Sequence, residues 1–83
     1  MPTEEILIKR TMPNSIEAEQ SVIGSMIMDR DAVMSASEIL VKEDFYHQQY
    51  GLLFQAMVDL FNDRQPVDLV TLQNKLKEMN VPP

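Results

Sequence analysis

The sequence predicts an all-α domain, a small orthogonal bundle of about four helices. Apolar residues recur every three or four positions between turn signals, which is the period of an α-helix. Capping residues and helix breakers divide the 83 residues into segments near 15–28, 32–40, 46–63 and 69–79. We therefore expect four helices over these ranges and no sheet.

The segment 46–63 is predicted to be the central helix, because it carries more large apolar residues than any other part of the chain. These residues cover more than half of the helix circumference, so we expect other elements to contact it from two or three sides. Its apolar stripe and those of the neighbouring helices define the expected core. The predicted core residues are Ile23, Phe45, Leu53, Phe54, Met57, Phe61 and Leu72.

Length and charge limit the possible functions. The 83 residues make one domain or part of one, and their net charge is −6. Lys and Arg are scattered, so we do not expect the chain to bind DNA by itself, because such binding depends on phosphate neutralisation. Without cysteine there is no disulfide or thiolate metal site, and no long apolar run predicts a signal peptide or a membrane span. A cytoplasmic location is expected.

The first 13 residues are predicted to form an N-terminal arm, and residues 14–83 the helical domain. Three consecutive apolar residues, from Ile6 to Ile8, are too few for a stable helix of their own. We expect the arm to be partly ordered, held against the body or a neighbour through Ile6 and Ile8.

The first helix is predicted from a capping box, in which Asn14 or Ser15 caps the helix and Glu17 reaches back. Gly24 lies inside this helix at a cost of roughly 1 kcal/mol relative to Ala. Small residues flank it, so we expect close packing within the domain there, with a partner contact as the alternative. The residues expected on the buried stripe are Ile16, Val22, Ile23, Met26 and Ile27.

Later breaks in periodicity separate the remaining helices. Residues 29–31 interrupt the apolar pattern and offer an N-cap to the second helix, and residues 42–44 are predicted to be a turn. The central helix should end within 62–66, where a polar run precedes a proline. Asp68 is the predicted N-cap of the last helix. The expected inward residues of that helix are Leu69, Leu72, Leu76 and Met79.

We expect no catalytic, cofactor or metal site in this chain. His47 is the only histidine and has no second ligand at a suitable spacing, so it should be solvated or hydrogen-bonded. The carboxylate pairs Glu17 with Glu19 and Glu43 with Asp44 are expected to be solvated, since residues one or two apart on a helix do not converge. No phosphate-binding loop, dinucleotide fingerprint or activated nucleophile is present in the sequence.

The segment 13–25 (PNSIEAEQSVIGS) resembles the opening motif of the bacterial replicative helicases of the DnaB family. Further blocks that resemble the family follow in matching order at residues 44–46 (DFY), 53–57 (LFQAM) and 66–72 (PVDLVTL). The resemblance covers about residues 13–80, and the joint spacing of the blocks makes it specific. Two departures, Tyr50 where the family often has His and Gln65 where it often has Gly, do not affect the expected fold.

The resemblance implies a role that this chain performs only as part of a larger protein. Family members are hexameric rings that use ATP and Mg²⁺ in a separate C-terminal motor domain to translocate on single-stranded DNA. Their N-terminal domains form a collar as a trimer of dimers and present a surface to primase and, in some cases, to a loader. Because a helical hairpin of the family lies beyond Pro83, the domain is expected to be incomplete at its C-terminal end.

The resulting hypothesis is an interaction and scaffold domain of a replicative helicase, in the primosome. It supports ring assembly and primase docking, has no ATPase activity of its own, and contacts DNA only through the parent protein. A free-standing helical adaptor and a small helix-turn-helix DNA-binding module are the alternatives. Exposed polar positions of the arm, of residues 29–31 and of residues 62–65 are the candidate partner contacts.

Overall fold

A computed structural model of the chain describes residues 6–7 and 15–79. All of the secondary structure in these residues is helical, so the all-α prediction is confirmed. Asn14 and Ile8, which the sequence assigned to a cap and to the arm, lie outside the described residues. The elements are α2 (Ile16–Met28), α3 (Arg30–Ile39), the 3₁₀-helix η1 (Lys42–Asp44), α4 (Gln48–Asn62) and α5 (Leu69–Glu78).

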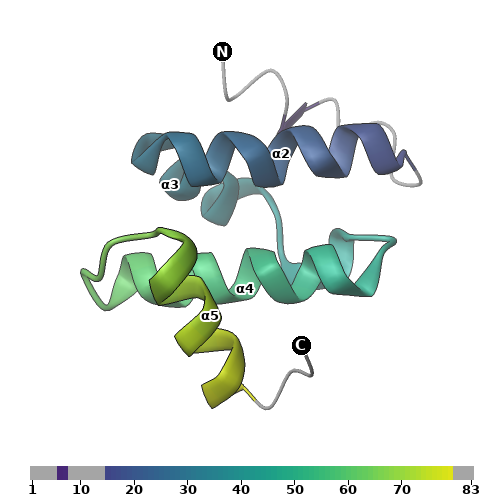
Figure 1. The fold of residues 1–83 in the computed structure, drawn as a ribbon. Helices are drawn as coiled ribbons and strands as arrows, with labels where there is room; N and C mark the ends of the chain where they lie inside the picture. Colours follow the sequence, from purple (N-terminus) through teal and green to yellow (C-terminus); the bar gives the residue numbers. More distant parts are fainter. Residues whose placement is uncertain (1–5, 8–14, 80–83) are drawn as a thin grey trace.

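The central helix is α4, as predicted. It contacts α2, α3, η1 and α5, and α2 also packs on α3. Figure 1 shows α2 and α4 lying side by side, with α5 crossing α4 at a steep angle. Because α5 makes its main contact with α4 alone, much of its remaining surface faces solvent.

The core lies between α2, α3 and α4 and is closed on one side by α5. The Phe45 and Phe54 rings meet in it, with centroids 5.1 Å apart. Ile6 of the arm is fully buried there. Of the seven residues expected in the core, Leu53 and Phe61 are only half-buried against it. The buried ones are Ile23, Phe45, Phe54, Met57 and Leu72.

The buried face of α2 differs from the predicted stripe. Ile16 and Ile27 were expected inside but are exposed, whereas Ala18 and Glu19 are buried. The stripe is rotated because α2 packs on both α3 and α4, and the arc between these two neighbours runs through Ala18 and Val22. In α5, likewise, Leu72 is buried but Leu69 is 73% exposed.

The start of α4 is set by the segment that precedes it. The helix was expected from residue 46 but begins at Gln48, because His47 has extended backbone angles (φ −89°, ψ 114°) and is the N-cap. The predicted 42–44 turn is the 3₁₀-helix η1, which lies against Gly51. A Cβ at Gly51 would lie 2.8 Å from the Lys42 carbonyl oxygen, so only glycine allows this approach.

Side-chain caps begin three of the helices. The Ser15 hydroxyl accepts from the Ala18 N–H at 3.2 Å, so Ser15 caps α2. Asp29 is the single residue between α2 and α3 and caps α3. In α5 the cap is reciprocal: Asp68 accepts from the Thr71 N–H at 2.9 Å, and the Thr71 hydroxyl accepts from the Asp68 N–H at 3.0 Å. The Thr71 N–H holds the pKa of Asp68 below its ordinary value of 3.8.

The C-terminal end of α4 has the hydrogen bonds of a Schellman motif. The Gln65 N–H donates to the Leu60 carbonyl at 2.9 Å, and the Arg64 N–H donates to the Phe61 carbonyl at 3.1 Å. This motif needs a left-handed residue, and Arg64 takes that position with φ 60°. The chain thus turns at an arginine where glycine would be unstrained.

Candidate interaction surfaces

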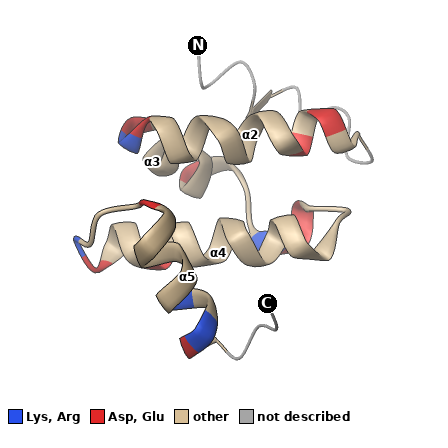
Figure 2. Cartoon of the chain, viewed as in Figure 1, with Lys and Arg blue, Asp and Glu red and all other residues tan. Residues whose placement is uncertain are grey.

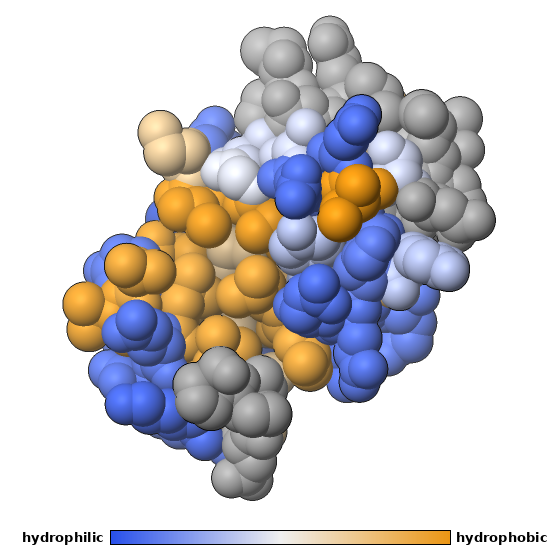
Figure 3. Space-filling view, turned by 45° about the vertical axis from the view of Figure 1, so that its right-hand side comes forward, coloured by the Kyte–Doolittle hydropathy of each residue, from blue (hydrophilic) through white to orange (hydrophobic). Residues whose placement is uncertain are grey.

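Several of the most exposed apolar residues belong to the last turn of α2 and the first turn of α5. Leu69 and Val70 are 73% and 66% exposed, and Met28 is 86% exposed. Figure 3 shows apolar side chains over a broad, continuous area of the face that it displays. Apolar areas of this kind on a small domain mark sites of protein contact more often than isolated exposed residues do. We call the exposed residues Ile27, Met28, Leu69 and Val70, together with the half-buried Val67, the apolar patch.

Arg30 brings the two sides of the patch together. Its guanidinium donates to the Gln65 carbonyl at 3.0 Å and stacks over the Phe61 ring at 4.8 Å. Residues 29–31 and 62–65, the two predicted contact segments in the described part, therefore touch each other. Residues 29–31 are the cap and first turn of α3 rather than an open turn.

Acidic and basic residues neighbour the apolar patch along the chain without a cluster of Lys and Arg. Figure 2 shows Lys and Arg on separate parts of the drawn chain, with the two lysines of α5 in its last turns. Four carboxylates and two arginines lie beside the patch in sequence. They are Asp29, Asp31, Asp63, Asp68, Arg30 and Arg64. This end of the molecule is therefore apolar and weakly acidic.

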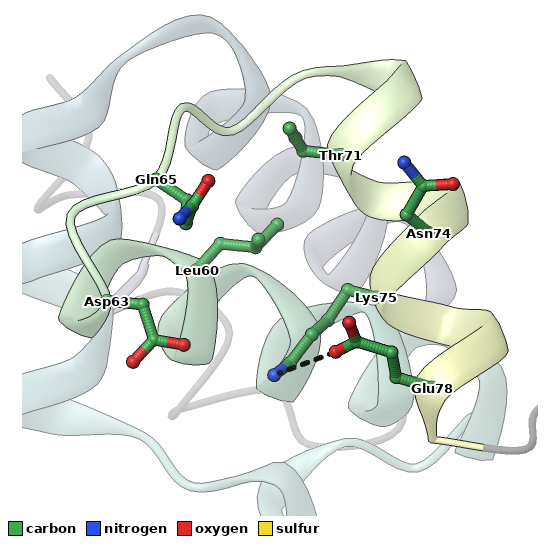
Figure 4. A pocket seen from close by; sticks show the side chains of 7 residues that line it. All are labelled: Leu60, Asp63, Gln65, Thr71, Asn74, Lys75 and Glu78. Atoms are coloured by element: carbon green, nitrogen blue, oxygen red, sulfur yellow. Dashed lines mark ion pairs between the residues drawn. The ribbon is translucent and has the colours of Figure 1, made fainter.

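A polar cleft of about 280 Å³ lies between the end of α4 and α5. Figure 4 shows side chains of both helices around it, with Lys75 and Glu78 paired at 3.6 Å. The Thr71 hydroxyl at its edge already donates to the Pro66 carbonyl at 2.7 Å. The Thr71 hydroxyl and the Lys75–Glu78 pair are thus already engaged within the chain. The described residues also contain no cluster of three or more His, Cys, Asp or Glu that could hold a metal.

Glu19 is not the solvated carboxylate that the sequence predicted. It is 0% exposed, and its oxygens accept from the backbone N–H groups of Tyr46 and His47 at 2.7 and 3.1 Å. The His47 ring completes the group, with Nδ1 lying 3.2 Å from Glu19 Oε1. His47 was expected to be either solvated or hydrogen-bonded, and its ring is within hydrogen-bond distance of Glu19. The partner is 28 residues away in the chain, which is why no local pattern indicated it.

Gly24 has no close neighbour from another element in the part of the chain that the structure describes. It is exposed, and a Cβ built on it would meet nothing within 4 Å. The expected close approach of another backbone to this flank of α2 is therefore not found among the described residues.

These features define a class of protein: a small all-α domain whose described part offers surfaces for protein contact and no reactive cluster. The family model described as the DnaB-like helicase N-terminal domain matches residues 11–82. The chain belongs to this family.

The similar proteins are replicative DNA helicases. The DnaB helicase of Geobacillus stearothermophilus is 44% identical over 72 residues, which cover 87% of this chain and 16% of that protein. The replicative DNA helicase DnaC of Bacillus subtilis (strain 168) is 39% identical over 72 residues, which again cover 87% of this chain and 16% of that protein. The DnaB helicase of Rhodothermus marinus is 38% identical over 68 residues, 82% of this chain and 7% of that helicase. The chain therefore spans a sixth or less of these three relatives.

No solved structure shows a significant match to the chain. In the part of the chain that the structure describes, no helix has the length and apolar character needed to cross a membrane.

Proposed function

We propose that this chain is the N-terminal interaction and scaffold domain of a hexameric, ATP-dependent replicative DNA helicase in the bacterial cytoplasm. Its partners in this proposal are further copies of the ring, primase and, where one is used, a loader. ATP and Mg²⁺ act in the motor domain of the parent protein, and DNA is contacted through that parent. Family membership supports the parent activity, since the similar proteins are replicative DNA helicases.

The observation that carries the interaction role is the apolar patch. The patch is held by capped helix ends and by the Arg30 contact to the 62–65 loop, so its residues are presented on a fixed frame. Burying exposed residues such as Leu69 and Val70 against a partner releases water from apolar surface at roughly 25 cal/mol per Å². A rigid apolar surface needs little ordering on binding, which favours its use in assembly.

The helix-turn-helix alternative receives no support from the arrangement of α4. This helix would be the recognition helix, but it is packed by α2, α3, η1 and α5. It also contains no Lys or Arg between Gln48 and Asn62. A helix enclosed by four elements and without basic residues has neither the free face nor the charge for a DNA groove.

The test is calorimetric titration of the C-terminal region of the cognate primase into this chain and into a longer chain that includes the following helical hairpin. We expect the longer chain to assemble and to bind primase. Val70→Ser should weaken primase binding or assembly at least tenfold if the patch takes part in it. Val41→Ser is the matched control, because Val41 is also an exposed valine but lies at the start of η1.

Three results would count against parts of the proposal. If a folded primase region gives no heat of binding with either chain, the docking role is excluded and assembly remains as the proposed function. Sedimentation measures assembly separately. Equal effects of Val70→Ser and Val41→Ser would remove the apolar patch as the contact. Salt-dependent DNA binding by this chain alone would favour the DNA-binding alternative.

A further inference from the structure

The Arg30 side chain, from the first turn of α3, contacts both ends of the turn that closes α4. Its Cζ lies 4.8 Å from the centroid of the Phe61 ring, and its Nη1 donates to the Gln65 carbonyl at 3.0 Å. Phe61 and Gln65 also belong to the Schellman motif: the Phe61 carbonyl accepts from the Arg64 N–H. The Gln65 N–H donates to the carbonyl of Leu60. One guanidinium thus spans the motif from residue 61 to residue 65.

The turn contains a position that is unfavourable for the residue it holds. Arg64 has φ 60°, a left-handed conformation that costs free energy for a residue with a Cβ and costs little for glycine. Gln65 follows directly, so a rotation of Arg64 out of this conformation would carry the Gln65 carbonyl away from α3. That rotation would break the hydrogen bond with Arg30. The Arg30 contact therefore opposes the relaxation of Arg64.

The same turn sets the direction of α5, as Figure 4 shows for the loop that carries Gln65. The loop after the turn is tied to the first turn of α5, because the Thr71 hydroxyl donates to the Pro66 carbonyl at 2.7 Å. In the described part of the chain, α5 makes its main contact with α4. A rotation in the turn would therefore move α5 together with its exposed residues Leu69 and Val70.

We propose that Arg30 is a positioning residue, which holds Arg64 in the left-handed conformation and thereby fixes the direction of α5. It also fixes the part of the apolar patch that α5 carries. The use of this patch by a partner rests on the proposed function, whereas the effect of Arg30 on the turn is a property of this chain alone.

The experiment combines Arg30→Ala with Arg64→Gly in this chain and is read by NMR. With Arg64 present, Arg30→Ala should speed amide hydrogen exchange at Gln65 about tenfold and change the residual dipolar couplings of α5 relative to those of α4. In the Arg64→Gly background, the same substitution should change the exchange rate by less than about twofold and leave the couplings unchanged. The reason is that glycine keeps the left-handed conformation without support.

A control variant separates this role from a general effect of removing surface charge. Glu38→Ala removes an exposed charge from the other end of α3 and should change neither the Gln65 exchange nor the α5 couplings. Equal effects of Arg30→Ala in the two backgrounds, or no effect in either, overturn the proposal. Urea midpoints of all variants show whether the exchange at Gln65 reports local opening or global unfolding, and a global origin also overturns it.

Titration of the primase region into the longer chain separates positioning from direct contact. Arg30→Ala should weaken binding about fivefold, and the added Arg64→Gly should restore it, because the direction of α5 is restored. If binding stays weak although exchange and couplings recover, Arg30 touches the partner itself and the positioning role in recognition is overturned. If the wild-type chain does not bind primase, the docking role fails, while exchange and couplings still decide the role of Arg30.

Discussion

Phe54→Ala should remove a large part of the stability of this domain. The Phe54 side chain is 2% exposed at the centre of α4, and its ring lies 5.1 Å from that of Phe45 at a tilt of 38°. Truncating a buried Phe costs about 3–5 kcal/mol, of which the lost ring pair supplies about 0.5–1.5 kcal/mol. Small domains of this length have a total of about 4–12 kcal/mol, so at least a quarter of the stability should be lost.

Leu53→Ala provides the comparison, because Leu53 is the adjacent residue of α4 but is only half-buried. Periodicity alone gives both positions the same expected cost of about 2–5 kcal/mol. The structure separates them: Leu53→Ala should cost about 1–2 kcal/mol, since roughly half as much apolar surface leaves the core. Urea denaturation followed by circular dichroism measures both values, with an unchanged m-value as the check on two-state behaviour.

The ring pair can be isolated with a double-mutant cycle between Phe54→Leu and Phe45→Leu. We expect a coupling of about 0.5–1.5 kcal/mol. A Phe54→Ala midpoint equal to that of the wild type, or a larger loss for Leu53→Ala than for Phe54→Ala, would show that the buried face of α4 is assigned wrongly.

Four further substitutions test the local geometry. Gly24→Ala should raise stability by about 0.5–1 kcal/mol, because a helical glycine with open space around it gains from a methyl group; an unchanged or lower urea midpoint contradicts this. Gly51→Ala should lower stability by about 1–3 kcal/mol, because its methyl group would lie 2.8 Å from the Lys42 carbonyl, and thermal unfolding of the two glycine variants should give opposite signs. Arg64→Gly should raise stability by about 0.5–1 kcal/mol by relieving the left-handed conformation at φ 60°, and a loss would mean that the arginine side chain contributes more than its backbone costs. Asp68→Ala should lower Tm at neutral pH. Because the folded pKa of Asp68 is below 3.8, its charged carboxylate stabilises the folded state above pH 3.8. The difference in Tm between wild type and variant should shrink as the pH falls through the lowered pKa.

Local sequence determined the helices and several of their ends. Ser15 and Asp68 accept hydrogen bonds from residues three positions on, and the proline at 66 follows the end of α4. These contacts lie within a few residues, so the pattern of residue types contains all the information that they need. The same holds for the central position of α4, whose apolar residues cover too much of the helix to be buried by one neighbour.

The tertiary structure alone decided which side chains the neighbouring helices cover. A helical period gives the direction of an apolar stripe but not the width and rotation of the covered arc, which depend on crossing angles. Leu69 and Ile27 are therefore exposed although they follow the period, and Gly24 is exposed as well. The burial of Glu19 depends on N–H groups 27 and 28 residues away. Burying a carboxylate costs free energy, and that cost is offset only once the fold has placed these donors around it.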